Sequence, residues 1–122
     1  MSKVLVIEDN GANRTLVRRI LEAEGLEVIE AESAGTGIAL ARKLIPDLIL
    51  MDLSMPELDG LAATRTLRQI PALQTVPIVA LTAHVMPEER SRALQICDGY
   101  IAKPIDVDAF PAEVQRYLRR DA

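Results

Sequence analysis

The chain has 122 residues, of which 49% are hydrophobic and 26% are charged, and this predicts one globular domain with a single core. Its formal net charge of -4 excludes the basic surface that nucleic-acid binding requires. The single cysteine, Cys97, excludes an internal disulfide and a multi-cysteine metal site, and it suits a reducing cytoplasm. Neither a signal peptide nor an apolar run long enough to span a bilayer is found, so we expect a soluble, cytoplasmic protein.

Apolar runs and helical periodicity alternate along the whole chain. Five short segments predict strands, in chain order at 3–7, 27–30, 48–52, 77–81 and 99–102. Four of them are mainly apolar, and the segment 27–30 is a brief apolar pair with polar flanks. Apolar residues that recur at helical spacing predict five helices, at about 13–24, 34–45, 63–70, 87–96 and 106–119. Residues that favour helix ends follow the first three of these helices, at Gly25, Pro46 and Pro71.

The alternation of strands and helices predicts an α/β fold with a parallel sheet and helices on both of its faces. The second and fifth strands are short, so we expect them at the edges of the sheet, with the other three between them. The expected strand order is 2-1-3-4-5, as in doubly wound, flavodoxin-like folds. The whole chain, 1–122, is expected to form one domain with no output domain attached.

Polar side chains lie at the carboxyl ends of four predicted strands, namely Glu8 and Asp9, Asp52, Thr82, and Lys103. In a parallel sheet of this order those ends meet in one crevice, which is where open α/β sheets bind ligands. Two ionised carboxylates about 4 Å apart repel each other by roughly 4 kcal/mol at an effective dielectric constant of about 20. Three carboxylates therefore need cations, and Lys103 supplies one positive charge. Mg²⁺ fits the remaining need, because it binds through one or two carboxylates and accepts phosphate oxygens.

These residue types together favour phosphoryl transfer onto a carboxylate, which is a recognised nucleophile. In this interpretation Asp52 accepts the group, the metal ion and Lys103 neutralise its charge, and the Thr82 hydroxyl hydrogen-bonds its oxygens. Taken singly, each residue also has an ordinary explanation. Glu8 and Asp9 are then loop acids, Thr82 is a strand-end hydroxyl, and Lys103 is a solvated surface lysine. Their joint arrival at four strand ends favours the functional interpretation.

Several motifs resemble the receiver domain of two-component response regulators. They are Ile7-Glu8-Asp9-Asn10, Leu50-Met51-Asp52-Leu53-Ser54-Met55-Pro56, Asp59-Gly60, Leu81-Thr82-Ala83 and Tyr100-Ile101-Ala102-Lys103-Pro104. Together they are specific, and the resemblance covers almost all of the chain.

The resemblance implies that Asp52 accepts a phosphoryl group from the phosphohistidine of a histidine kinase or of a histidine phosphotransfer protein. The implied Mg²⁺ site consists of the side chains of Glu8, Asp9 and Asp52 and the backbone carbonyl of Ser54. Lys103 assists the transfer. By the same resemblance the protein is a signalling switch that catalyses its own phosphorylation and dephosphorylation, and not a metabolic enzyme.

The resemblance also concerns the response to phosphorylation. Thr82 and Tyr100 resemble the switch pair of the family, and the Lys103-Pro104 peptide bond is expected to be cis. Phosphorylation is expected to reshape the surface of the fourth helix, the strand at 99–102 and the last helix, where an unidentified downstream protein binds. The short chain is similar to single-domain receivers that relay phosphate or act by docking. We expect a monomer or a weak homodimer that contacts neither nucleic acid nor membrane.

One segment departs from the family pattern. Members usually have a glycine in the step between the fourth helix and the fifth strand, whereas Leu94-Gln95-Ile96-Cys97-Asp98-Gly99 has none before Cys97 and is one residue short. A residue other than glycine with positive φ there costs on the order of 1 kcal/mol. The missing glycine concerns the backbone at the end of the fourth helix and does not affect the acceptor site. Cys97 itself is expected to be a small core residue.

Other classes of protein share parts of the pattern. A phosphatase with a strand-end Asp nucleophile needs a second Asp two residues later as general acid, and this chain has Ser54 there. A flavodoxin-like FMN carrier needs a phosphate-cradling loop and aromatic residues, whereas the first strand is followed by Glu8-Asp9-Asn10 and the chain has one Phe and two Tyr. A plain scaffold is left only if the acids do not converge. The single histidine, His84, is expected at the crevice rim, where it controls with Ser54 the access of water to the phosphoryl group.

Overall fold

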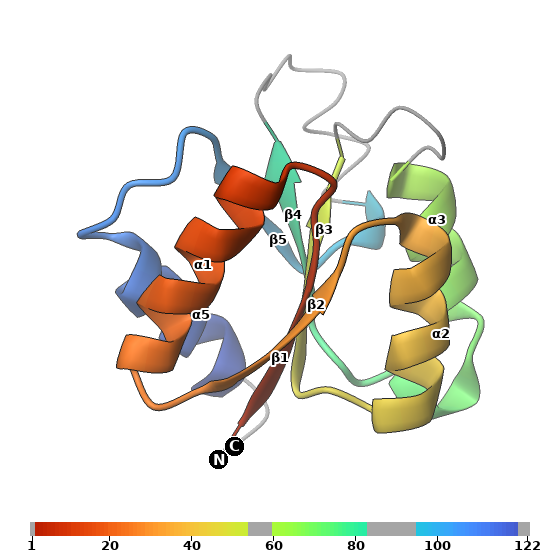
Figure 1. Cartoon of the computed structure of the whole chain (residues 1–122). Coiled ribbons are helices and arrows are strands. Elements are labelled where there is room, and N and C mark those ends of the chain that lie inside the picture. Colours follow the sequence, from red (N-terminus) through yellow and green to blue (C-terminus); the bar gives the residue numbers. More distant parts are fainter. Residues whose placement is uncertain (1, 54–59, 83–94, 120–122) are drawn as a thin grey trace.

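The computed structural model describes residues 2–53, 60–82 and 95–119, and in them five parallel strands form one sheet with helices on both faces (Figure 1). The strands are β1 (Lys3–Ile7), β2 (Glu27–Ala31), β3 (Leu48–Asp52), β4 (Ile78–Thr82) and β5 (Gly99–Ala102). Their order across the sheet is β2-β1-β3-β4-β5, which confirms the doubly wound topology expected from the sequence.

The helices form two layers around the sheet. α1 (Gly11–Ala23) and α5 (Phe110–Arg119) cover one face, and α2 (Ala34–Leu44) and α3 (Gly60–Arg68) cover the other (Figure 1). A short 3-10 helix, η1 (Pro71–Leu73), follows α3. The helix predicted at 87–96 falls mostly on residues 83–94, which lie outside the described residues. Within the described part of the chain, no helix combines the length and apolarity that crossing a bilayer requires.

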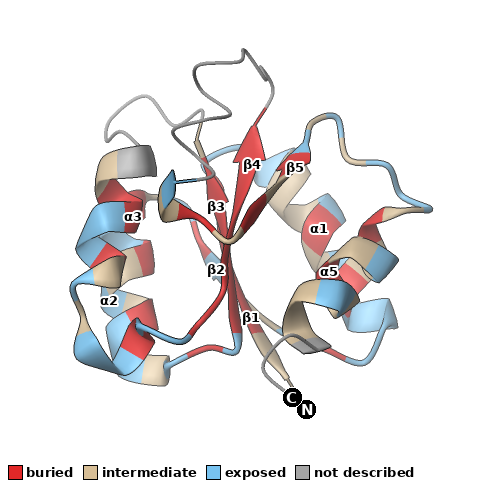
Figure 2. Cartoon of the chain, turned by 180° about the vertical axis from the view of Figure 1, so that it is seen from behind, coloured by how far each residue is buried: buried red, intermediate tan, exposed pale blue. Residues whose placement is uncertain are grey.

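The core consists of two apolar clusters, one on each face of the sheet. Val4 and Val6 of β1 pack on the face that α1 and α5 cover, and Leu5 and Ile7 pack on the opposite face. β3 and β4 are buried at every position, which explains their uninterrupted apolar sequences. Figure 2 shows the buried residues concentrated along the sheet and on the helix sides that face it. The sheet is thus a rigid support for the residues at its carboxyl edge.

The start of α1 is fixed directly beside the acids that follow β1. Asn10 is the N-cap, and its Oδ1 accepts a hydrogen bond from the backbone N–H of Asn13 at 3.0 Å. At the other end the chain leaves the helix through Gly25, which has φ of 81°. The cap places the first turn of α1 against Glu8.

Two of the helix ends that differ from the sequence prediction have a local cause in the structure. Ile45, expected in the buried stripe of the second helix, is its C-cap, with φ of 45° and 41% of its surface exposed. The proline that follows Ile45 explains this, because the residue before a proline avoids the right-handed helical region. The last helix begins at Phe110 and not near Asp106, because Asp106 Oδ1 accepts hydrogen bonds from the N–H groups of Asp108 and Ala109 and forms a separate turn.

The segment before β5, which lacks the family's glycine, is held by an ion pair. Arg68, in the last turn of α3, pairs with the Asp98 carboxylate and donates to the carbonyl oxygens of Ile96 and Val76. Asp98 Oδ2 also accepts from the N–H of Ile78 at 2.7 Å. No residue from 95 to 98 has a positive φ, so the described part of this segment carries none of the backbone strain considered from the sequence.

Cys97 lies in the same segment and is buried in the cluster that α2 and α3 cover, as expected. Burial raises the pKa of its thiol to about 11. The thiol is therefore neutral near pH 7 and acts as a small packing group.

Two glycines of α2 provide a test of how closely this helix packs on the sheet. A Cβ at Gly37 would lie 2.4 Å from Ile7 Cδ1, and Ile7 is completely buried, whereas a Cβ at Gly35 would meet nothing within 4 Å. Overpacking at a buried position costs about 1–3 kcal/mol, and the helix propensity gained from alanine is about 1 kcal/mol at most. We therefore expect Gly37→Ala to lower the free energy of unfolding.

The matched variant Gly35→Ala should instead raise the free energy of unfolding by up to about 1 kcal/mol, since the helical backbone there accepts alanine without strain. Urea unfolding followed by circular dichroism measures both changes. Equal stabilisation by the two variants would show that α2 does not pack against Ile7 as described.

Candidate active site

The carboxyl edge of the sheet brings together the residues that the sequence analysis selected. β1 and β3 pair with Ile7 opposite Met51, so Glu8 and Asp52 follow side by side. The β4–β5 register places Thr82 opposite Ala102, next to Lys103. Glu8 and Asp52 are each 1% exposed, which is rare for carboxylates that have no specific partners.

Lys103 joins the two buried carboxylates. Its Nζ lies 3.0 Å from Glu8 Oε2, 3.2 Å from Glu8 Oε1 and 3.1 Å from Asp52 Oδ1. Its backbone N–H donates to the Thr82 carbonyl at 2.8 Å, which ties the lysine to the end of β4. The Lys103–Pro104 peptide bond is cis. A cation is thus fixed within contact distance of the carboxylate proposed from the sequence as the phosphoryl acceptor.

Two residues of α1 that the sequence analysis did not select also belong to this site. Asn13 Nδ2 donates to Glu8 Oε1 at 3.2 Å, and Arg14 Nη1 donates to the Glu8 carbonyl oxygen at 2.9 Å. The N-cap residue Asn10 is the one sequence feature that points to these contacts, because a cap at this position places the first turn of α1 beside the end of β1. The partner of each side chain was not evident from spacing alone.

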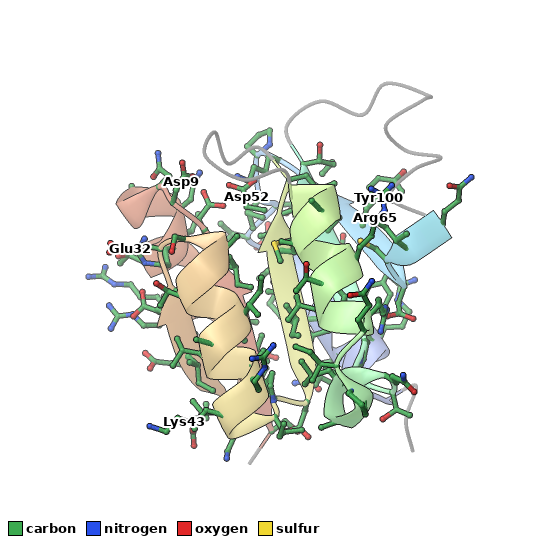
Figure 3. The ribbon with its side chains drawn as sticks, turned by 90° about the vertical axis from the view of Figure 1, so that its right-hand side faces the viewer. Asp9, Glu32, Lys43, Asp52, Arg65 and Tyr100 are labelled. Carbon is green, nitrogen blue, oxygen red and sulfur yellow. The ribbon has the colours of Figure 1, made fainter. Side chains whose placement is uncertain are left out.

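Three carboxylates form a cluster that suits a cation. Oxygen atoms of Glu8, Asp9 and Asp52 all lie within 4.8 Å of one another, with Asp9 exposed and the other two buried. Figure 3 shows Asp9 and Asp52 at the same end of the molecule. If all three are ionised, Lys103 leaves a net charge of -2 in the cluster. A hard divalent cation with oxygen ligands matches both this charge and this donor set.

Burial and neighbouring side chains shift the pKa values of two groups in the site. Burial, with a hydrogen bond to Asp52, raises the pKa of Glu8 to about 7, although Lys103 opposes the change. Burial alone would lower the pKa of Lys103, but its hydrogen bonds to Glu8 and Asp52 outweigh burial and raise it. Lys103 is therefore a permanent cation of the site, and one ammonium does not fully compensate the two buried acids.

The remaining predicted site residues are only partly placed. Thr82 is buried at the end of β4, and Tyr100 is half-buried on β5, packed against the cluster that α2 and α3 cover. In Figure 3 Tyr100 lies toward the same end of the molecule as Asp52. Ser54 and His84 lie outside the described residues. The structure thus brings together Glu8, Asp9, Asp52, Thr82 and Lys103 at one edge.

Comparison with known proteins identifies the class to which this fold and site belong. The family model described as the response regulator receiver domain matches residues 4–115. The polar-differentiation response regulator DivK of Brucella ovis is 40% identical over 116 residues, which are 94% of each chain. The chain therefore belongs to the response regulator receiver domain family, whose members are signalling proteins of two-component systems and not metabolic enzymes.

Solved structures agree with this assignment. Chemotaxis protein CheY4 of Vibrio cholerae superposes with a TM-score of 0.91 at 28% identity, covering 96% of this chain and 98% of its own. The receiver domain of a sensor histidine kinase from Pseudomonas aeruginosa superposes with a TM-score of 0.84 at 36% identity, covering 98% of this chain and 95% of its own. That structure has a magnesium ion coordinated in its active site cleft.

Proposed function

We propose that the protein is a phosphorylation-dependent switch in which Asp52 accepts a phosphoryl group from a histidine kinase or a histidine phosphotransfer protein. The observation that carries this proposal is the environment of Asp52. Its carboxylate is buried at the carboxyl edge of the sheet, 3.1 Å from Lys103 Nζ and within a cluster of three acids. Such a carboxylate is held for attack by a fixed cation while bulk water is excluded from it.

The transfer forms one bond and breaks one. An oxygen of Asp52 attacks the phosphorus of the phosphohistidine, and the P–N bond breaks with its electron pair returning to the imidazole. The product is an aspartyl phosphate, and the donor is left as histidine. Lys103 stabilises the negative charge on the transferring group, because its ammonium already lies between Glu8 and Asp52.

The acidic cluster supports Mg²⁺ as the cofactor of this reaction. We propose that Glu8, Asp9 and Asp52 hold the ion, together with the backbone carbonyl of Ser54, which lies outside the described residues. When bound, Mg²⁺ neutralises phosphoryl charge and lowers the repulsion between the acids and the incoming group. The magnesium ion reported in the Pseudomonas aeruginosa receiver domain supports this assignment by similarity.

The same proposal assigns a response to phosphorylation. Thr82 lies at the end of β4, where its hydroxyl can hydrogen-bond a phosphoryl group on Asp52, and Tyr100 lies on the neighbouring strand β5. Movement of Thr82 toward the phosphoryl group would let Tyr100 turn inward. This would reshape the surface of β5, α5 and the predicted fourth helix at 87–96, most of which lies outside the described residues. A downstream protein would bind there. Ser54 and His84 are proposed to control the water that hydrolyses the aspartyl phosphate.

Incubation with acetyl phosphate tests this function. Intact-mass measurement should show one added phosphoryl group with Mg²⁺ and none in metal-free buffer. Asp52→Asn should show none in either case, whereas Asp47→Asn, which removes an exposed acid just before β3, should behave as the wild type. Equal labelling of the Asp52→Asn protein would refute the assignment of the acceptor.

A further inference from the structure

Glu8 is supported by the first turn of α1 at two points. Asn13 Nδ2 donates to its Oε1 at 3.2 Å, and Arg14 Nη1 donates to its backbone carbonyl oxygen at 2.9 Å. Arg14 is held in turn by Glu30 of β2, with Nε 3.4 Å from Oε1. Both the backbone and the carboxylate of Glu8 are therefore connected to neighbouring elements of the fold.

The carboxylate of Glu8 needs such support, because its own rotamer does not determine its orientation. The last torsion of a glutamate is broad and roughly two-fold, so rotation of the carboxylate plane is easy. A glutamate also loses considerable side-chain entropy when it is fixed. Lys103 Nζ lies at similar distances from the two oxygens, 3.0 and 3.2 Å, so Lys103 distinguishes poorly between them. The hydrogen bond from Asn13 is directed to Oε1 and removes this ambiguity.

The chemical type of Asn13 also suits a position beside a cation site. Its amide donates a hydrogen bond to the carboxylate without adding positive charge that would repel a divalent ion. Arg14, which follows Asn13 in the chain, directs its guanidinium instead to the Glu8 carbonyl oxygen and to Glu30. The negative charge of Glu8 is thus left for the metal ion and for Lys103.

We propose that Asn13 is a positioning residue that fixes the plane of the Glu8 carboxylate and thereby sets the Mg²⁺ affinity of the acidic cluster. This inference rests on the proposed function, because it concerns the same metal site. Outer-shell partners of metal-binding carboxylates typically contribute 10- to 100-fold to affinity. A partly exposed neutral amide belongs at the lower end of that range.

Isothermal titration calorimetry with MgCl₂ tests the proposal on the whole protein. Asn13→Ala should raise the Kd for Mg²⁺ about 10-fold. The matched control Thr15→Ala, two residues further along α1, should leave it unchanged. The rate of phosphoryl uptake by Asn13→Ala should be low at limiting Mg²⁺ and should return to the wild-type rate in excess Mg²⁺. A merely structural role would not produce this dependence on metal concentration.

The outcomes separate the two proposals. A wild-type Kd in Asn13→Ala would overturn the role of Asn13 and leave the metal site standing, provided that the wild-type protein binds Mg²⁺. Absence of Mg²⁺ binding by the wild type would overturn both. Melting curves in metal-free buffer should coincide for Asn13→Ala and wild type. If Asn13→Ala loses as much free energy of unfolding in metal-free buffer as it loses free energy of Mg²⁺ binding, the loss of affinity is structural and the proposal is wrong.

Discussion

Lys103→Met is expected to slow phosphoryl uptake from acetyl phosphate by about 10²–10³-fold, the usual loss when one preorganised donor to a developing charge is removed. The reason is the position of Lys103 Nζ, 3.1 Å from Asp52 Oδ1 and 3.0 Å from Glu8 Oε2. Methionine keeps most of the apolar stem and removes the ammonium. Intact-mass time courses at fixed, saturating Mg²⁺ give the rate directly.

Lys43→Met is the control for this substitution. Lys43 is exposed in the last turn of α2, at the opposite end of the molecule from Asp52 (Figure 3). The Lys43→Met substitution removes the same charge from the protein at a position outside the site. The rate of phosphoryl uptake by this variant should therefore equal that of the wild type. A rate for Lys103→Met within threefold of the wild type would mean that the ammonium does not act on the transferring group.

Arg68→Met is expected to lower the free energy of unfolding by about 2 kcal/mol. Arg68 pairs with Asp98 and donates to two backbone carbonyls, those of Ile96 and Val76. Hydrogen bonds to charged groups contribute about 1.5–3 kcal/mol each when buried. About a quarter of each side chain is exposed, 26% for Arg68 and 29% for Asp98, so solvent screening reduces the total.

Urea unfolding provides the measurement, with a lower midpoint expected at an unchanged slope. Arg42→Met is the matched control, because Arg42 is an exposed arginine in the last turn of α2 and has the same relation to its helix dipole. Its effect should stay within about 0.5 kcal/mol. Equal changes for the two variants would show that the pair with Asp98 does not stabilise the entry to β5.

The sheet was predictable because four of its strands are short, mainly apolar segments bounded by polar or turn residues, whereas β2 includes Glu27 and Glu30. β3 and β4 are buried throughout, and a continuous apolar sequence is the direct consequence. The convergence of Glu8, Asp52 and Lys103 followed from the topology, since carboxyl ends of parallel strands meet at one edge. No side-chain contact had to be known for either inference.

The features missed are those that depend on individual side-chain partners. Asn13 has no periodic pattern that connects it with Glu8, and its contact depends on the orientation of α1 after the cap. The pair of Arg68 and Asp98 joins residues 30 positions apart, and only the folded chain reveals it. The second helix ends one residue before the end of its apolar stripe, because the proline after Ile45 keeps that residue out of the right-handed helical conformation.

The central claim is that the phosphoryl group is carried by Asp52, and chemical trapping tests it most directly. Borohydride reduces an aspartyl phosphate to homoserine, so protein phosphorylated in Mg²⁺, reduced and digested should contain homoserine at position 52 and at no other aspartate. Mass spectrometry of the peptide that contains β3 identifies the change. Homoserine at another position, or a stable phosphoryl group on a serine or on His84, would contradict the assignment of Asp52 as the acceptor.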